Sequence, residues 1–424
     1  MPAFFAVSVA PSIAALDPAS WDACANPQYL RSDKGLRPPG DSVLQPAGSN
    51  CEGLDPFLQV PESPSARERF NPFITHAFLL ALEASKSVGA RAGWGPAHVL
   101  VHRGGELVAA APAYLKSHSM GEYVFDHAWA EAYARAGGDY YPKLQVAVPF
   151  TPAAGRRLLL AREDSSARDA LVSGLRALRQ QAGASSIHVT FAPKGEWEAL
   201  GAQGFLLRKG QQFHFLNKGY ADFDAFLADL ASRKRKMIRR ERKEALANGI
   251  EIFALTGAQI KSEHWDALFR FYMDTGSRKW GRPYLTRAFF DLAGATMSSR
   301  ILLVMARRAG RWIAGAINFI GDDALYGRNW GAVEEHPFLH FEVCYYQAIE
   351  FAIARGLARV EAGAQGEHKL ARGYGPVTTY SAHDFADPRM TKAIGDYLEH
   401  ERVHVDEEIE MYAEHAPFRK SESP

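Results

Sequence analysis

Apolar and polar positions follow two periods along the chain: a period of two residues, typical of strands, and a period near 3.6, typical of helices. In the first half these patterns predict strands at 3–9, 144–149 and 186–191, a hairpin at 97–115, and helices at 18–25, 74–86, 127–136 and 166–182. In the second half they predict strands at 211–216, 324–331 and 358–362, a hairpin at 301–320, helical pieces within 222–247, and helices at 262–274, 286–295, 341–355 and 391–413. Helices and strands mixed in both halves predict an α/β (α+β) protein.

The two halves also match each other in sequence. Three segments recur in the same order: Trp21-Asp22-Ala23 as Trp265-Asp266-Ala267, 72–79 as 283–290, and 105–111 as 310–316. Repetition of this kind indicates two copies of one fold, which divides the chain into a first domain at 1–210 and a second domain at 211–424. The first copy is longer, because it carries an inserted loop at about 31–69 that is rich in Pro, Gly and Ser.

Composition narrows the class of protein. The chain of 424 residues is 47% hydrophobic and 23% charged, an ordinary balance for a folded globular protein. Its formal net charge of +1 means that any affinity for nucleic acid must come from a local patch. The three cysteines, Cys24, Cys51 and Cys344, are too scattered for a disulfide framework or a metal cluster. No signal peptide and no apolar run of membrane-spanning length is recognised, so we expect a cytoplasmic protein. We also expect no permanently bound cofactor.

A local patch of positive charge occurs in the predicted helix 232–247. Eight of the eleven residues from 233 to 243 are lysine or arginine, and only Glu241 and Glu244 offset them. A run of one sign often forms no more than a solvated helix face. Here the excess of positive charge makes two interpretations equally good: a solvated helix face, and a binding surface for an anionic partner such as RNA or a nucleotide phosphate.

A second group of candidate residues follows the strand 358–362. Gly366-Glu367-His368-Lys369 and Arg372 place an acid, a base and two cations within seven residues. They end a β-α-β unit, in which ligands usually sit at the strand ends. Such a group suits proton abstraction from an amine and stabilisation of an anionic intermediate. The alternative is a polar loop with a hydrogen-bonded histidine.

Two pairs of histidines and a set of aromatic residues allow other interpretations. His400 and His404 lie one helical turn apart with Glu401 between them, as in zinc peptidases, but a third ligand is missing. A zinc metallopeptidase is therefore the weaker alternative. His336 and His340 have the same spacing, but Pro337 between them favours a loop. The following aromatic residues either line a substrate groove or belong to the core: Trp94, Trp129, Trp330, Tyr133, Tyr140 and Tyr141.

Several longer motifs resemble one protein family. They are the segment 72–83, Gly93-Trp94, Asp126-His127-Ala128-Trp129, Tyr140-Tyr141-Pro142-Lys143, His340-Phe341, Cys344-Tyr345-Tyr346, and Gly363-Ala364-Gln365-Gly366-Glu367-His368-Lys369. Together with the basic helix they are similar to the FemAB-like predicted N-acyltransferases, also labelled peptidoglycan biosynthesis or recognition proteins. The resemblance implies two tandem GNAT-like domains, each with a mixed, mostly antiparallel central sheet flanked by helices.

The resemblance also implies an activity, the transfer of an acyl or aminoacyl group from an activated donor to an amine acceptor such as a peptidoglycan-type peptide. The donor it implies is an aminoacyl-tRNA or an acyl-CoA. The segment 333–340, where GNAT enzymes carry a glycine-rich loop for the CoA pyrophosphate, has no glycine and two acids, which argues against conventional CoA binding. A non-catalytic peptide- or RNA-binding module on the same fold is the alternative from another class.

This interpretation assigns candidate roles to individual residues. The catalytic candidates are Glu367, His368 and Lys369. The donor-binding candidates are Arg235, Arg239 and Arg242. The substrate-binding candidates are Arg372, Arg328, Trp330, His340, Gln365, Asp126, His127, Trp129, Tyr141 and Lys143.

Overall fold

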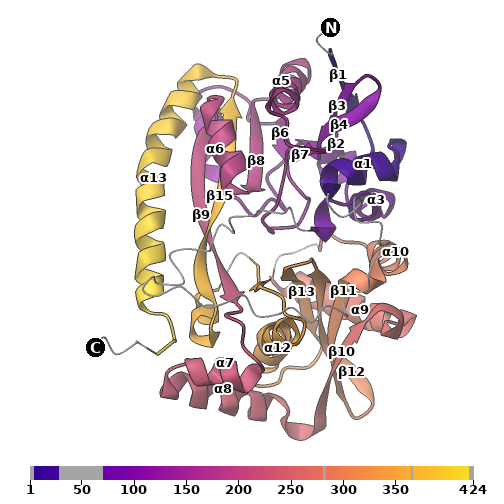
Figure 1. Ribbon diagram of the computed structural model, residues 1–424, viewed down its shortest axis with the longest axis vertical. Coiled ribbons are helices and arrows are strands. Elements are labelled where there is room, and N and C mark those ends of the chain that lie inside the picture. The colour runs from indigo at the N-terminus through magenta and orange to yellow at the C-terminus, as the bar shows by residue number, and fades with distance from the viewer. Residues whose placement is uncertain (1–3, 28–69, 280–282, 364–365, 420–424) are drawn as a thin grey trace.

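The computed structural model describes residues 4–27, 70–279, 283–363 and 366–419 (Figure 1). Most of the predicted inserted loop at about 31–69 lies outside these residues. The first half contains the following elements: β1 (Phe5–Ala10), α1 (Pro18–Ala25), α3 (His76–Ala84), β2 (Trp94–Pro96), β3 (His98–Arg103), β4 (Glu106–Ala111), β5 (Ala113–Lys116), α4 (His127–Arg135), β6 (Lys143–Val146), β7 (Leu159–Leu160), α5 (Ser165–Gln181), β8 (Ser186–Ala192) and α6 (Lys194–Ala202).

The second half begins within one long strand and ends with the longest helix. Its elements are β9 (Leu206–Leu216), α7 (Phe223–Asp229), α8 (Ser232–Ala245), β10 (Ile250–Thr256), α9 (Ser262–Lys279), α10 (Arg287–Met297), β11 (Ile301–Arg308), β12 (Arg311–Ile320), β13 (Ala324–Ala332), α11 (Leu339–Phe341), the π-helix η7 (Glu342–Tyr346), α12 (Gln347–Ala354), β14 (Arg359–Glu361), the 3-10 helix η8 (Glu367–Arg372), β15 (Gly375–Phe385) and α13 (Pro388–Glu414). None of the described helices combines the length and apolar composition of a membrane-crossing segment.

Strand order confirms the internal duplication. The first half forms a four-stranded sheet in the order β1-β3-β4-β7, and the second half repeats this order as β10-β11-β12-β13. Both hairpins contain a bulge at the matching place, between Val101 and His102 in one and between Ala306 and Arg307 in the other. Because a bulge is a local feature of one backbone, its recurrence at the same register supports two copies of one fold.

The two copies share one large sheet. Eleven strands run in the order β10-β11-β12-β13-β14-β9-β15-β8-β6-β5-β2, so the sheet passes from one half to the other through β9 and β15. The predicted boundary between residues 210 and 211 lies inside β9. The sequence pattern does not predict β15, because its buried positions include Ser381 and His383 among apolar residues.

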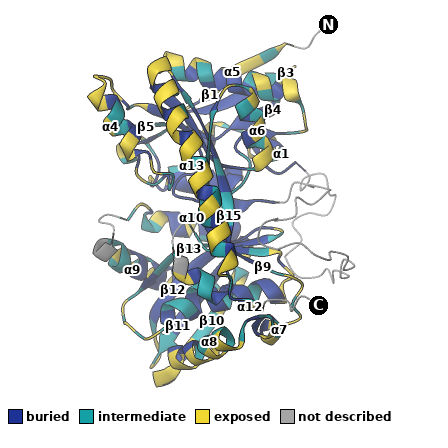
Figure 2. Ribbon diagram, turned by 90° about the vertical axis from the view of Figure 1, so that its left-hand side faces the viewer, coloured by how far each residue is buried: buried dark blue, intermediate teal, exposed yellow. Residues whose placement is uncertain are grey.

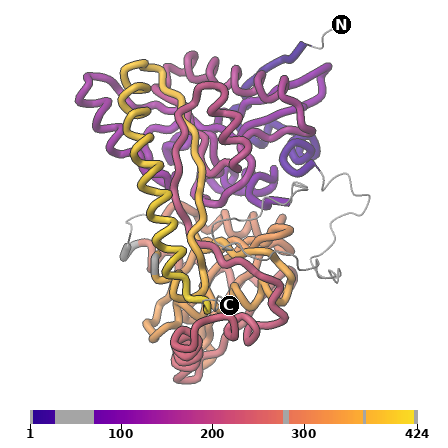
Figure 3. The backbone as a smooth tube through the Cα atoms, turned by 60° about the vertical axis from the view of Figure 1, so that its left-hand side comes forward, coloured from indigo at the N-terminus to yellow at the C-terminus, as the bar shows by residue number. Residues whose placement is uncertain are grey.

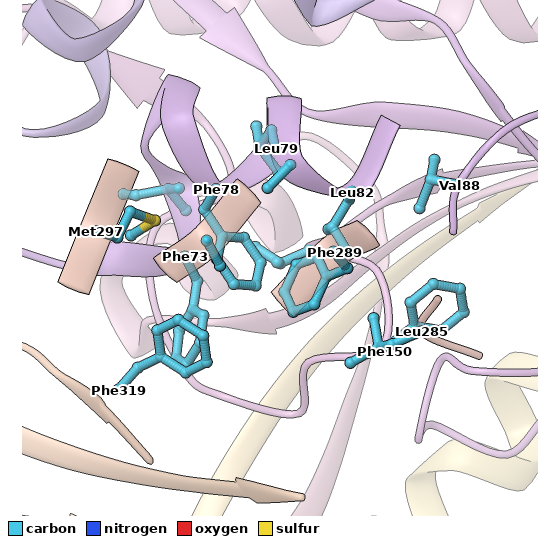
Figure 4. Packing of buried hydrophobic residues seen from close by; sticks show 14 of the residues in the cluster. Phe73, Phe78, Leu79, Leu82, Val88, Phe150, Leu285, Phe289, Met297 and Phe319 are labelled. Atoms are coloured by element: carbon cyan, nitrogen blue, oxygen red, sulfur yellow. The ribbon is translucent and has the colours of Figure 1, made fainter. Parts of the chain in front are cut away.

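The halves meet through equivalent helices. α3 and α10 begin within the repeated segments 72–79 and 283–290 and pack on each other, with the rings of Phe78 and Phe289 5.8 Å apart (Figure 4). Thr286, at the start of α10, donates a hydrogen bond through its hydroxyl to the carbonyl of Ser85. A single apolar cluster contains residues of both halves, including Phe73 and Phe319. The relative position of the halves is therefore fixed by a common core.

The last helix, α13, spans both halves (Figures 1 and 3). It packs along β9 and β15 and buries one face, which includes Met390, Leu398 and Ile409. Its other face is exposed (Figure 2). Hydrogen-bonded ion pairs, such as that of Arg208 with Glu401, attach it to β9. This helix supports the strands that connect the two copies.

Candidate functional site

The second half contains a gap between two parallel strands. β13 and β14 pair only where Ala324–Tyr326 lies beside Arg359–Glu361, and β13 then continues to Ala332 without β14. The connection between them runs through α11, η7 and α12. Ligands of α/β folds sit outside the carboxyl ends of parallel strands, where neighbouring strands diverge. The candidate site is built around this gap.

His368 lies at this place with its ring nitrogen bonded to a tyrosine. Its Nε2 is 2.9 Å from the Tyr345 hydroxyl, which comes from the π-helix η7. Burial, together with the positive charges of Arg372 and Lys369, holds the pKa of His368 below its usual value. The imidazole is therefore uncharged at neutral pH and can accept a proton. π-Helical turns occur frequently at functional sites, because they reposition one side chain within a helix.

Aromatic rings pack against this histidine, which is otherwise exposed. The ring of His340 lies 5.2 Å from Trp330 and 5.3 Å from Tyr345, and Phe341 lies 5.6 Å from His368. The structure thus brings together three residues that the sequence pointed to, Trp330, His340 and His368. Tyr345 was part of the family resemblance but received no role from the sequence. Its position follows from the π-helix, which the helical periodicity of 341–355 does not reveal.

Lys369 is buried beside His368, with 2% of its surface exposed. Its Nζ donates a 3.0 Å hydrogen bond to the carbonyl of Gly363, just after β14. Burial lowers the pKa of Lys369 to about 8. Among the described side chains no carboxylate pairs with this ammonium. A buried cation of this kind is costly, and such groups concentrate at functional sites. The ammonium therefore lies next to the strand gap, and because its pKa is lowered it loses its proton more easily than an exposed lysine does.

Arg372 is occupied by contacts within the protein. Its Nη2 and Nε donate to the two carboxylate oxygens of Glu241 at 2.8 and 3.1 Å, and its Nη1 donates to the His368 carbonyl at 2.7 Å. Its guanidinium also stacks 3.4 Å above the ring of Phe341. The sequence assigned substrate binding to Arg372, whereas these contacts give it the position of a brace between α8 and η8.

The basic helix α8 divides its cations between two faces. Arg242 donates to Glu342 and Glu350, so this donor-binding candidate holds α8 against η7 and α12. Arg239 is exposed and pairs with Asp224 at 3.1 Å. Arg235 is half-buried. The outward face carries five exposed cations: Arg233, Lys236, Arg239, Arg240 and Lys243.

Arg328 connects the candidate site to the first half. It lies on β13, and its Nη2 donates a hydrogen bond to the carbonyl of Phe150. Burial lowers the pKa of this arginine from its usual value. Next to it, the rings of Phe150 and Tyr284 stack 4.8 Å apart. The substrate-binding candidate Arg328 therefore lies at the junction between the halves.

Three of the first-half candidates meet in a buried polar cluster. The Nζ of Lys143 donates to Ser119, Glu122 and Asp126, at 2.9 Å for Ser119 and 2.7 Å for Glu122. Ser119 also contacts the Tyr141 hydroxyl at 2.8 Å. Lys143 has no exposed surface. Since all three of its protons have acceptors, Lys143 ties the loop 117–126 to β6 and has no free proton for a substrate.

The other two first-half candidates lie on opposite sides of α4. Trp129 is buried and stacks on His188 with its ring 6.1 Å away, and Arg208 lies over its indole. His127 is exposed and stacks on Phe125. Trp129 thus belongs to the packing between α4 and the sheet. The structure does not bring His127 to the polar cluster.

Two candidates and one motif need separate statements. Gln365 and the side chain of Glu367 lie outside the described part of the chain. His400 and His404 are exposed on α13, and the Nδ1 of His400 contacts its own helix at the Asp396 carbonyl. Among the described residues no group of three or more His, Cys, Asp or Glu side chains is placed to hold a metal ion. The zinc peptidase interpretation therefore lacks a ligand set in that part of the chain.

One family model matches most of the chain. The model of the FemAB-like family, described as peptidoglycan biosynthesis/recognition, matches residues 59–420. The comparison with curated proteins found no match.

Solved structures show distant similarity over long segments. A crystal structure of FemX is 11% identical, covers 74% of this chain and 93% of its own, and superposes with a TM-score of 0.47. A tandem GNAT protein from the clavulanic acid biosynthesis pathway is 12% identical, with 91% and 99% covered and a TM-score of 0.43. L-PGS from Bacillus licheniformis is 10% identical, with 78% and 98% covered and a TM-score of 0.47.

Proposed function

We propose that this chain, which belongs to the FemAB-like family of acyltransferases with a tandem GNAT fold, transfers an aminoacyl group from aminoacyl-tRNA to an amine. The reaction takes place at the strand gap between β13 and β14. The observation that carries this proposal is the buried ammonium of Lys369 beside the His368–Tyr345 pair. A proton acceptor and a cation at one strand end are the two groups that acyl transfer to an amine requires.

The proton of the attacking amine needs an acceptor. Tyr345 lies within hydrogen-bond distance of His368, so its hydroxyl can take the amine proton while passing its own to Nε2 of the uncharged imidazole. The amine nitrogen forms a bond to the carbonyl carbon, and the bond from this carbon to the ribose oxygen of the tRNA breaks. The leaving oxygen then receives the proton from His368 through Tyr345. The enzyme returns to its starting protonation state.

The carbonyl oxygen gains negative charge during attack. Lys369 is mostly protonated at neutral pH, since its pKa is about 8. A buried ammonium interacts strongly with a developing oxyanion, because little water screens it. We assign this stabilising role to Lys369. Arg372 acts as a positioning residue, because it bonds the His368 carbonyl.

The form of the donor site favours a polyanion over CoA. Glu241 in α8 holds Arg372 in η8, so the exposed cations of α8 belong to the same rigid unit as the candidate site. The loop after β13, where a CoA pyrophosphate would need free amides, instead presents Glu334, which pairs with Arg308 and His336. Charged tRNA is a cytoplasmic donor, and we expect the reaction in that compartment.

The acceptor is an amine that enters at the junction of the two halves, near Arg328, Phe150 and Tyr284. The family description favours a peptidoglycan-type peptide with a free amino group. A peptide of this kind is anionic and extended. Arg328 offers a guanidinium at the junction for its carboxylates.

The test is a transfer assay on the purified chain with three donors: total aminoacyl-tRNA, acetyl-CoA, and a longer acyl-CoA. Acceptors are a panel of muropeptides, free amino acids and diamines, and mass spectrometry detects N-acylated products. We expect product from aminoacyl-tRNA. Product only from an acyl-CoA would overturn the donor assignment. Salt-sensitive tRNA binding without product from any donor would favour the non-catalytic binding module.

A further inference from the structure

The first half contains an equivalent of the strand gap. Its counterpart of β13 is β7, because β7 follows the hairpin β3–β4 and pairs with β4 as β13 pairs with β12. Its counterpart of β14 is β8, since the alignment of Val189 with Val360 places these strands at the same point of the repeat. β7 and β8 lie in different sheets and do not pair. Unlike β13 and β14, these two strands share no paired residues, although the chain before β7 meets β8 where the Gly155 amide donates to the Phe191 carbonyl at 3.0 Å.

Two side chains fill this first-half gap. Glu196 accepts hydrogen bonds from the amides of Arg157 and Leu158 at 3.1 and 3.2 Å, on the segment that enters β7. Arg157 is 1% exposed, and its Nε donates to the Thr190 carbonyl on β8 at 2.8 Å. Its remaining bonds go to the carbonyls of Ala153, Gly155 and Arg156. A carboxylate and a guanidinium thus replace the backbone hydrogen bonds that these two strands do not make with each other.

The second-half gap is lined differently at the matching places. Leu159 pairs with Ala110 as Gly331 pairs with Gly315, so Trp330 corresponds to Leu158. The amide of Val333 bonds β12 and that of Ala332 bonds Thr275 on the other side. Because amides alternate along a strand, the Trp330 amide also points away from β12, toward the gap. On the β14 side, the Nζ of Lys369 donates a hydrogen bond to the Gly363 carbonyl.

The sequence repeat also includes Glu196. The spacing that aligns Val189 with Val360 also aligns Gly195-Glu196 with Gly366-Glu367. Gly366 has a φ of +116°, a conformation that side-chain-bearing residues rarely adopt, whereas Gly195 has no positive φ. The two glycines therefore direct the chain differently after their strands. In the first half this direction brings Glu196 onto the strand amides.

From these contacts we propose that Arg157 and Glu196 close the first-half equivalent of the strand gap. The Glu196 carboxylate then occupies a binding site, at the amides of Arg157 and Leu158, for a small carboxylate or carbonyl oxygen. Acyl transfer then takes place at one strand gap, that of the second half. The assignment of acyl transfer to the second-half gap rests on the proposed function. The proposal that Glu196 occupies the first-half gap does not rest on it.

The test removes the carboxylate and offers another one. Glu196→Ala leaves the amides of Arg157 and Leu158 without an acceptor, so we expect its melting temperature to fall by roughly 2–6 °C. Sodium formate or acetate should restore at least half of this loss in a saturable way, whereas sodium chloride at equal ionic strength should not. The matched control is Glu198→Ala, two residues later on the exposed side of α6, which should respond to neither salt.

Three outcomes would overturn the proposal. One is a folded Glu196→Ala variant without carboxylate-specific recovery. If this variant does not fold in chloride, its refolding yield from urea in formate provides the same comparison, and equal yields in both salts would count as failure. The third is a folded variant that loses acyl transfer by 100-fold or more, because Glu196 would then serve the reaction. Absence of transfer by the unmodified chain would sink the proposed function alone, since the melting experiment needs no activity.

Discussion

Arg372 and Glu241 form a two-point ion pair, with nitrogen–oxygen distances of 2.8 and 3.1 Å. Glu241 is the one buried acid of the basic helix α8, and it also accepts a hydrogen bond from the Tyr346 hydroxyl. The pair therefore joins three parts of the second half: the basic helix, the π-helix region and the segment that carries His368 and Lys369. The acid that interrupts the run of cations is the one that connects this run to the site.

Breaking this pair should damage both stability and transfer. In Glu241→Gln the Arg372 guanidinium stays buried without a full counter-charge, and such changes cost about 3–5 kcal/mol. We expect urea denaturation to show a loss of this size. The double variant Glu241→Gln/Arg372→Met removes the unpaired charge as well, so it should recover part of the stability but not the transfer rate. Equal stability of Glu241→Gln and the unmodified chain would contradict the role of the pair.

The pH dependence of transfer should have two limbs. His368 must be uncharged to accept a proton, and its pKa lies below 6.5, so the rate should rise with pH on the acid side below that value. Lys369 must be charged, so the rate should fall as pH rises through about 8. Lys369→Arg should extend activity to higher pH, because an arginine stays protonated there. An alkaline limb that remains near pH 8 in Lys369→Arg would contradict the assignment.

Stability should depend on Lys369 in a second pH range. The pKa of its ammonium is about 8 in the folded chain and near 10.5 when unfolded, so between these values the unfolded chain binds more protons. Stability then rises with pH across this window, relative to Lys369→Met, which lacks the group. Denaturation curves at pH 7, 9 and 10.5 measure the difference. An identical pH dependence for both proteins would show that the lysine is not buried.

The exposed cations of α8 should set the affinity for tRNA. Arg233, Lys236 and Arg240 share one helix face, and their replacement by Gln should weaken tRNA binding and make it less dependent on salt. The control triple, Arg135→Gln/Arg389→Gln/Lys392→Gln, removes the same charge from exposed positions of α4 and α13. Filter binding at several salt concentrations separates the two. A similar loss of affinity in both triples would assign binding to net charge alone.

Lys143 should behave as a structural residue. Its replacement by Met leaves Asp126 buried without its cation and leaves Glu122 with Lys116, whose Nζ lies 3.7 Å away, and we expect the free energy of unfolding to fall by about 3–5 kcal/mol. The Michaelis constant for the acceptor should change little in any folded fraction. A large rise in this constant with unchanged stability would return Lys143 to the substrate-binding role that the sequence suggested.

The sequence predicted the parts of the fold that have a clear local pattern. The hairpins β3–β4 and β11–β12 are apolar runs on the two sides of a glycine turn, and α5 has a helical period, so their positions agree with the prediction within a few residues. β15 was missed because its inward side chains Ser381 and His383 are polar, and they are satisfied only by partners such as His188 on β8. No pattern in one strand reveals a partner nearly two hundred residues away.

The candidate site was predictable in composition but not in roles. The motif that contains His368 and Lys369 was visible, because glycine, acid, base and cation stand next to each other. The role of Arg372 depended on Glu241, which in the sequence looks like a minor break in a run of cations. The same holds for Lys143, whose acceptors Ser119, Glu122 and Asp126 lie on a loop without periodic pattern. Contacts of this kind become readable only when the chain is folded.

We propose that Lys369 stabilises the oxyanion of acyl transfer in the gap between β13 and β14. Single-turnover transfer from aminoacyl-tRNA at saturating donor tests it most directly, with Lys369→Met compared against the unmodified chain and Lys143→Met. We expect a loss of roughly 100-fold or more in the rate for Lys369→Met with unchanged tRNA affinity, and a small effect in folded Lys143→Met. A rate for Lys369→Met within twofold of the unmodified chain would contradict it.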